Sequence, residues 1–324
     1  MTVTVERGGR AVRRKRDPHR PRRPRRSRDP YALFLLPGAL AFLAVVVVPF
    51  LMNTGVSFTE WQGVGTPRWT GLANYRELLD DSEFWASFRH SLLMVVAMAV
   101  VPTAVGLVLA AALFDFVGRH FGTRTASVLR ACFYLPQVLP IAVAGIVWSW
   151  ILAPENGALN ELLSVLHLGS WQRDWLGDPD LALYSVMGVM VWVQLGFPLV
   201  VFMAGLQRVD PQLHEAAELD GAGWWRRFRH VTLPQIRPEI HVVLLWCTIA
   251  ALKVFGAVYV LTKGGPGGAT EVPSYFSFTT FFEKTQVGYG AAVSTVLTVI
   301  ILALAVAGLR WQTRVEDAEE GVAR

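Results

Sequence analysis

Residues 90–114 read HSLLMVVAMAVVPTAVGLVLAAALF and contain no Asp, Glu, Lys or Arg. A helix needs about 20 apolar residues to cross a bilayer core of about 30 Å, so this stretch is long enough to span a membrane. Four other charge-free stretches are also long enough. They are residues 30–59, 131–154, 181–207 and 285–309. Residues 240–262 are equally apolar except for Lys253, and we expect them to form a sixth span.

The overall composition agrees with a membrane protein. Of the 324 residues, 53% are hydrophobic and only 17% are charged, below the roughly 25% that is usual in soluble domains. We therefore predict an all-α polytopic membrane protein, with a six-helix transmembrane domain over residues 31–311. A secreted, fibrous or disordered protein is excluded. Cys132 and Cys247 lie in or beside predicted spans, too few for a disulfide framework or a metal cluster.

The distribution of basic residues predicts the orientation. If the connecting segments are assigned alternately to the two sides, one side carries 23 Lys and Arg and the other carries 5. The positive-inside rule places the richer side in the cytoplasm, together with residues 1–30 and 312–324. We expect residues 1–30 to be a disordered basic tail that contacts anionic lipid. A nucleic-acid-binding arm is the alternative for this Arg-rich segment, and we predict no nucleic-acid partner.

The longest cytoplasmic connection, residues 208–240, has the pattern of two short helices. Asp210 and Pro211 are typical of an N-cap and first helical position, and the helix would stop at Asp220-Gly221. A second helix after Gly223 would present Trp224, Phe228 and Val231 on one face, and we expect Pro234 to end it. This element would dock another protein or lie as an amphipathic connector at the membrane interface.

The residues of this connection are similar to a known motif. Glu215-Ala216-Ala217 followed by Asp220-Gly221-Ala222 closely resembles the EAA loop of ABC-importer permease subunits. Flanking motifs resemble the carbohydrate-uptake, MalF-like branch of that family over nearly the whole of residues 31–311. They include GLANY at 71–75, FYLP at 133–136, PENGALN at 154–160, WVQLGFP at 192–198, AGLQ at 204–207, LTKGGP at 261–266 and Ser274-Tyr275.

The resemblance implies a permease subunit of the bacterial plasma membrane, with an EAA-type coupling helix between spans 4 and 5. It implies as partners a second homologous permease, two cytoplasmic ATPase subunits, an extracytoplasmic solute-binding protein and a sugar substrate. Glu215, Ala216, Ala217, Asp220 and Gly221 would then couple the permease to the ATPases. We also expect Gly221 to be required either by positive φ or by a close backbone approach.

The family supplies much of its substrate-facing surface from the fourth and fifth spans. The matching candidates here are Trp192, for stacking on a sugar ring, and Gln194 and Lys253, for hydrogen bonds to hydroxyls. Each could instead serve in helix packing, interhelical bonding or a buried ion pair. Gly196 with Pro198 is expected to break the fourth helix locally and expose backbone to the path.

Other functions fit the sequence less well. An ion-coupled secondary transporter would need intramembrane acids, and no Asp or Glu lies within any predicted span. A membrane enzyme would need clustered polar groups at membrane depth. Residues 264–268 lack the GK of a phosphate-binding loop, and position 218 is Glu where a zincin-like motif after His214 needs His. We therefore expect no catalytic, metal or cofactor site in this chain, and ATP hydrolysis in separate subunits.

Overall fold

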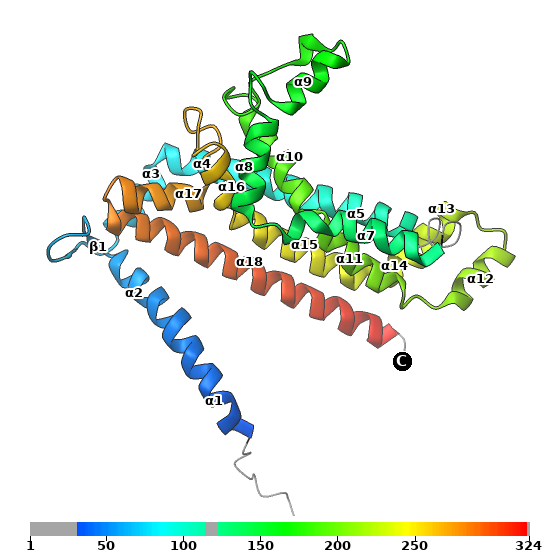
Figure 1. Cartoon of the computed structure of the whole chain (residues 1–324). Coiled ribbons are helices and arrows are strands. Elements are labelled where there is room, and N and C mark those ends of the chain that lie inside the picture. The colour runs from blue at the N-terminus through cyan, green and yellow to red at the C-terminus, as the bar shows by residue number, and fades with distance from the viewer. Residues whose placement is uncertain (1–30, 114–121, 323–324) are drawn as a thin grey trace, which may run out of the picture. The chain divides into compact units, whose positions relative to one another are not determined.

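The computed structural model describes residues 31–113 and 122–322 (Figure 1). The predicted tail at 1–30 lies outside the described residues. The described part is mainly helical, which agrees with the predicted fold class. The α-helices are α1 (Tyr31–Phe42), α2 (Val48–Val56), α3 (Ala73–Asp80), α4 (Ser82–Val95), α5 (Val101–Ala111), α7 (Gly122–Val138), α8 (Ile141–Ile151), α9 (Ala158–Val165), α10 (Ala182–Gln194), α11 (Gly196–Leu206), α12 (Pro211–Leu219), α13 (Trp224–Arg227), α14 (Leu233–Gln235), α15 (Arg237–Leu252), α16 (Gly256–Leu261), α17 (Pro273–Phe278) and α18 (Val287–Val322).

Shorter elements complete the chain. The π-helical turns are η1 (Leu43–Val47), η2 (Val96–Val100), η5 (Phe228–Thr232) and η6 (Thr279–Glu283), and η4 (Gly169–Trp171) is a 3-10 turn. One antiparallel pair joins β1 (Thr59–Glu60) to β2 (Arg68–Trp69), with Thr59 opposite Trp69. The chain divides into two compact units, residues 1–51 and 52–324. In the first, Phe34, Leu35 and Val45 are exposed, as expected of lipid-facing side chains.

Four of the six predicted spans are continuous helices. Among the described residues, those long and apolar enough to cross a membrane are Phe34–Val56, Ser82–Ala111, Ala182–Leu206 and Val287–Arg314. They correspond to the first, second, fourth and sixth predicted stretches. The last helix, α18, continues to Val322, so the boundary expected at residue 311 does not end it.

The third and fifth stretches are not single helices. The third consists of α7 and α8, bent by 98° between Val138 and Ile141. Pro140 stands at the N-cap of α8 with extended ψ of 132°. Because it has no N–H and disfavours helical backbone at the residue before it, it cannot continue α7. The fifth stretch stops as α15 at Leu252 and resumes as α16 at Gly256, with Phe255 at φ −136° and ψ −58°.

Two glycines explain how α16 lies so close to α8. A Cβ at Gly256 would be 2.8 Å from Cγ2 of Ile141, and one at Gly145 would be 2.8 Å from Cγ1 of Val260. Each glycine therefore leaves room for a branched side chain of the other helix, and the two helices pack closely at these positions. The fifth stretch therefore breaks where α16 turns to make this contact.

The fourth span is interrupted less than predicted. Only Leu195 separates α10 from α11, and its dihedral angles remain helical, at φ −60° and ψ −31°. The N–H of Phe197 donates to Oε1 of Gln137 over 3.0 Å, which satisfies a donor freed at this junction. Gly196 permits the approach of α7, since its Cβ would lie 2.8 Å from the Cα of Tyr134. Helical backbone thus continues through Leu195, where a local break was expected.

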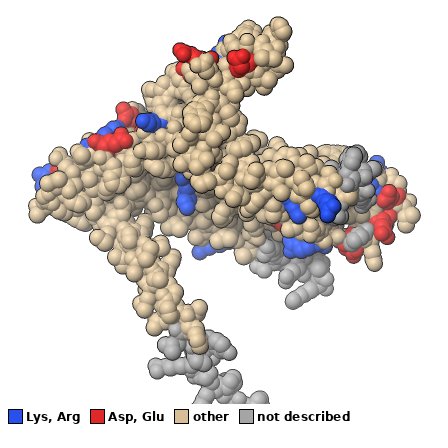
Figure 2. All heavy atoms as spheres, viewed as in Figure 1, with Lys and Arg blue, Asp and Glu red and all other residues tan. Residues whose placement is uncertain are grey.

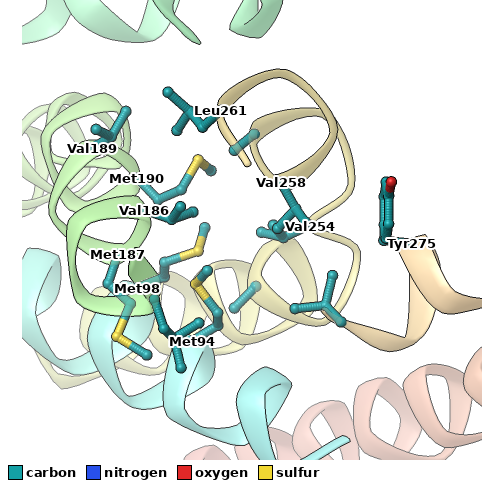
Figure 3. Close-up of a cluster of buried hydrophobic side chains, with 14 of the residues drawn as sticks. Met94, Met98, Val186, Met187, Val189, Met190, Val254, Val258, Leu261 and Tyr275 are labelled. Carbon is teal, nitrogen blue, oxygen red and sulfur yellow. The ribbon is translucent and has the colours of Figure 1, made fainter. Parts of the chain in front are cut away.

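Three buried clusters of described residues hold the helices of residues 52–324 together, and two of them are larger than the third. The first is rich in methionine: Met94 and Met98 from α4 and η2 meet Met187 and Met190 from α10, with residues of α16 opposite them (Figure 3). Methionine side chains adapt to irregular gaps between helices. The second cluster joins α5, α11 and α15 through residues that include Leu199, Phe202, Val243 and Cys247.

Candidate functional site

The helix α12 begins as the sequence predicts. Asp210 is its N-cap, and the side chain accepts a hydrogen bond of 2.9 Å from the N–H of Gln212. Pro211 occupies the first turn, where a missing N–H removes no intrahelical bond. Within residues 52–324, α12 lies beyond α11 and α14, at one end of this unit (Figure 1).

The turn after α12 is a Schellman motif. The N–H of Gly221 donates to the carbonyl of Glu218 over 3.0 Å, and the N–H of Ala222 donates to that of Ala217 over 2.9 Å. Gly221 has φ +74°, which confirms the first of the two expected requirements. No described atom lies within 4 Å of where its Cβ would be. The glycine is therefore required by backbone conformation and not by crowding.

The second helix of the connection is longer than predicted. α13, η5 and α14 form a helical run from Trp224 to Gln235, and regular geometry is lost only at Ile236, at φ −101°. The expected end at Pro234 was wrong. The π-helical turn before it shifts the hydrogen-bond register, so that Pro234 falls in the first turn of α14, where proline is tolerated. The aromatic face is present: Trp224 stacks on Phe228 with ring centroids 5.3 Å apart.

The predicted coupling residues lie on an open surface. Glu215, Ala216 and Asp220 are exposed, and Ala217 is partly buried. Nη1 of Arg227 is 2.8 Å from Oε2 of Glu218, which ties α13 to α12. Acidic side chains gather at this end of the molecule with basic ones beside them (Figure 2). The arrangement presents a braced helix to the surroundings and leaves Glu215 available for a basic group.

The predicted path residues do not converge on one pocket. Trp192 is 37% exposed and meets Trp148 of α8 edge-on, with ring centroids 5.4 Å apart. Gln194 is buried beside the thiol of Cys247, and its Nε2 has no hydrogen-bond partner in the described part of the chain. Gly196 contacts α7, as described above. Lys253 is exposed at the break between α15 and α16.

A hydrogen bond that the sequence did not reveal forms at the break between α15 and α16. The Ser274 hydroxyl donates to the carbonyl oxygen of Val254, an acceptor that the broken helix leaves without its usual backbone N–H donor. A pocket of about 400 Å³ lies beside it. It is lined by Asn53, Phe255, Ser274, Ser277, Phe278, Phe281, Phe282 and Ser294. The only sequence signal for Ser274 was its place in the family-like motif Ser274-Tyr275. That motif gives no information about which residues Ser274 contacts in space.

A polar network joins α4, the segment before α17 and the start of α18. Asp81 caps α4 and accepts a hydrogen bond of 2.6 Å from the Tyr289 hydroxyl. Nζ of Lys284 lies 3.4 Å from Oε2 of Glu83, and Nδ1 of His90 donates to the backbone carbonyl of Glu271 over 2.9 Å. Burial raises the pKa of the Glu271 carboxyl, and the nearby Lys284 opposes that shift. These contacts fix this end of three helices.

Comparison with known proteins agrees with this geometry. Residues 103–318 match the family described as "Binding-protein-dependent transport system inner membrane component". The chain is 36% identical to the probable ABC transporter permease YurN of Bacillus subtilis, covering 87% of this chain and 95% of that protein. It is 30% identical to the trehalose/maltose permease MalF of Thermococcus litoralis, over 86% and 92% of the two chains.

A further relative and a solved structure extend the likeness. The diacetylchitobiose permease NgcF of Streptomyces coelicolor is 32% identical, covering 92% of this chain and 84% of that one. A subunit of a bacterial alginate ABC transporter, solved with an alginate-bound periplasmic protein, has the same fold with a TM-score of 0.75 at 20% identity, over 89% and 96% of the chains. The chain therefore belongs to the family of binding-protein-dependent ABC-transporter permeases, in its MalF-like branch.

Proposed function

We propose that this chain is the permease subunit of an ATP-driven importer for a carbohydrate, forming half of the translocation path. The observation that carries the proposal is the braced helix α12, whose exposed Glu215, Ala216 and Asp220 precede a Schellman turn at Gly221. Membership of the permease family supports it, as do relatives named for trehalose/maltose and diacetylchitobiose uptake. Hydrolysis of ATP belongs to separate subunits.

The partners follow from this assignment. A second homologous permease would complete the path, two cytoplasmic ATPases would dock at α12, and an extracytoplasmic solute-binding protein would deliver the sugar. The alginate transporter, whose structure is a complex with an alginate-bound periplasmic protein, supports the last of these. The 23 to 5 distribution of basic residues supports a plasma-membrane protein of six spans with both tails in the cytoplasm. In this arrangement α7 with α8, and α15 with α16, are the two bent spans.

Residues 208–240 act as the coupling loop of this arrangement. Closure of the ATPases would move α12, and the movement would reach the fourth and fifth spans through the two ends of the loop. The Met-rich cluster lies between these spans and the second. Its adaptable side chains suit a region that repacks as the path alternates between outward-facing and inward-facing forms.

The energy source tests the proposal against an ion-coupled transporter. Uptake of the cognate sugar by cells expressing the whole system should stop when ATP is depleted while the ion gradient is maintained. It should continue when an ionophore collapses the gradient and ATP is held constant. The opposite pattern would contradict the assignment.

Lys253→Met is expected to raise the sugar concentration for half-maximal uptake by several-fold and to leave assembly unchanged. Lys253 is exposed at a helix break, so its ammonium can donate to sugar hydroxyls, and its loss uncovers no buried charge. Lys263→Met, which removes another exposed lysine, is the matched control. Loss of the assembled complex in detergent, or an unchanged concentration dependence, would remove Lys253 from the path.

A further inference from the structure

The two ends of the coupling loop are joined by an ion pair. Arg208 follows α11, at the beginning of the loop, and Glu239 lies in the first turn of α15, at its end. Their side chains form a salt bridge in which Arg208 is 74% exposed and Glu239 only 9% exposed. The pair therefore links the first residues of the coupling loop, which carries α12, to its last residues.

The Glu239 carboxylate is held in a place where a charge needs a partner. A Cβ at Gly205 of α11 would be 3.0 Å from both Cγ and Cδ of Glu239, so this side chain lies directly on the α11 backbone. Its Oε2 is buried and has no hydrogen-bond partner among residues 31–113 and 122–322. The first turn of a helix favours a negative charge. Arg208 supplies the counter-charge, and a carboxylate buried without one is strongly destabilising.

The packing around the pair is apolar. Leu206 at the end of α11 and Val209 in the loop just after it share a buried cluster with Ile236, which immediately precedes α15. Apolar contacts hold two surfaces together but are non-directional. The ion pair is directional, and its Glu239 side chain packs against Gly205. It therefore fixes the position of the end of α11 relative to the start of α15. By contrast, the pair of Arg227 and Glu218 lies within the loop and joins α12 to α13.

We propose that Arg208 and Glu239 are positioning residues that fasten the cytoplasmic ends of α11 and α15, so that displacement of α12 moves both spans together. This inference rests on the proposed function, because it assigns to the pair the transmission of movement from the ATPases. Neither residue is needed for docking. The pair controls how much transport each ATP hydrolysed produces.

The test uses the whole complex in proteoliposomes, with the cognate sugar, and compares Arg208→Gln, Glu239→Gln and the double variant. The measured quantities are the sugar transported per ATP hydrolysed and the amount of ATPase that co-purifies. Arg208→Gln should lower the transport ratio most, by about fivefold or more, because it leaves a buried carboxylate unpaired. Glu239→Gln should lower it by about twofold, since only the pairing is lost. The double variant should match Glu239→Gln, as residues that act as a pair are not additive.

Arg310→Gln, which neutralises an exposed arginine near the end of the last span, is the control and should keep the wild-type ratio. A wild-type ratio of sugar transported per ATP hydrolysed in Glu239→Gln would overturn the proposal. Because glutamine is isosteric with glutamate, this variant keeps the test decisive even if Arg208→Gln proves unstable. Multiplication of the two single effects in the double variant would also overturn it. Loss of ATPase from either single variant would instead assign the pair to docking. A wild-type complex without ATP-dependent uptake would contradict the proposed function itself.

Discussion

Gly221→Val is expected to abolish sugar uptake and to reduce the amount of ATPase that co-purifies with the permease. Gly221 has φ +74°, a conformation that costs an L-residue roughly 1–2 kcal/mol and a β-branched residue more. Relief of that strain would break the two hydrogen bonds of the Schellman turn. In the proposed arrangement α12 docks on the ATPase as a rigid element, so a change in its exit angle would displace Glu215 from the docking surface. The measurement is uptake by the reconstituted complex together with the ATPase retained.

The chain offers a control two residues away. Gly223 has φ −63° and ψ 164°, which any residue adopts, and no described atom lies within 4 Å of its Cβ position. Gly223→Val should therefore keep most of the uptake. If the two valine variants behave alike, backbone conformation at Gly221 is not what the loop requires.

Gly288→Ala is expected to prevent the permease from accumulating in folded form, although it adds one methyl group. A Cβ at Gly288 would lie 1.9 Å from the carbonyl oxygen of Thr59. That carbonyl cannot easily move, because it accepts a 2.9 Å hydrogen bond from Asn74, which also donates to Ser57 over 2.8 Å. Overpacking usually costs about 1–3 kcal/mol, and a clash with fixed backbone lies at the upper end or beyond.

The yield of monodisperse protein in detergent and its thermal unfolding temperature measure this effect. Gly188→Ala is the matched control, since Gly188 lies in α10 with no described atom within 4 Å of its Cβ position. Alanine is also the better helix former, so this control should be neutral or stabilising. Equal yield and equal unfolding temperature in the two variants would contradict the close approach of α18 to β1.

The sequence was sufficient for the features that depend on local chemistry. A charge-free run such as residues 90–114 predicts a span because no other structure satisfies the backbone in lipid. Asp210, Pro211 and Gly221 predicted the cap, the start and the turn of α12, since each residue type has a strong conformational preference. These signals need no knowledge of neighbouring helices.

Features that depend on tertiary contact were not accessible in this way. The break after Leu252 contains no proline, and it is explained by Gly256 and Gly145, which bring α16 onto α8 from different parts of the chain. The opposite error occurred at Pro198, where helical backbone continues because Gln137 of α7 accepts the hydrogen bond from Phe197. Proline and glycine indicate where a helix can break, whereas the packing of other helices decides whether it does.

The substrate path was the least predictable part. Trp192 and Gln194 were chosen by residue type, but positions two apart on a helix point to different sides. The structure accordingly has Trp192 against Trp148 and Gln194 beside Cys247. The pairing of Arg208 with Glu239 was equally hidden, because the two residues are separated in sequence by the whole loop.

The most direct test of the central claim is a cross-link from α12 to the ATPase. In a variant with Cys132 and Cys247 replaced by alanine, Glu215→Cys would be labelled with a photoreactive maleimide and irradiated in the transporting complex. The same label at Ser170→Cys, an exposed position in η4, is the control. We predict that the label at residue 215 forms an adduct with the ATPase subunit and that the label at 170 does not. An active complex in which residue 215 gives no ATPase adduct, or in which residue 170 gives the same yield, would contradict the account.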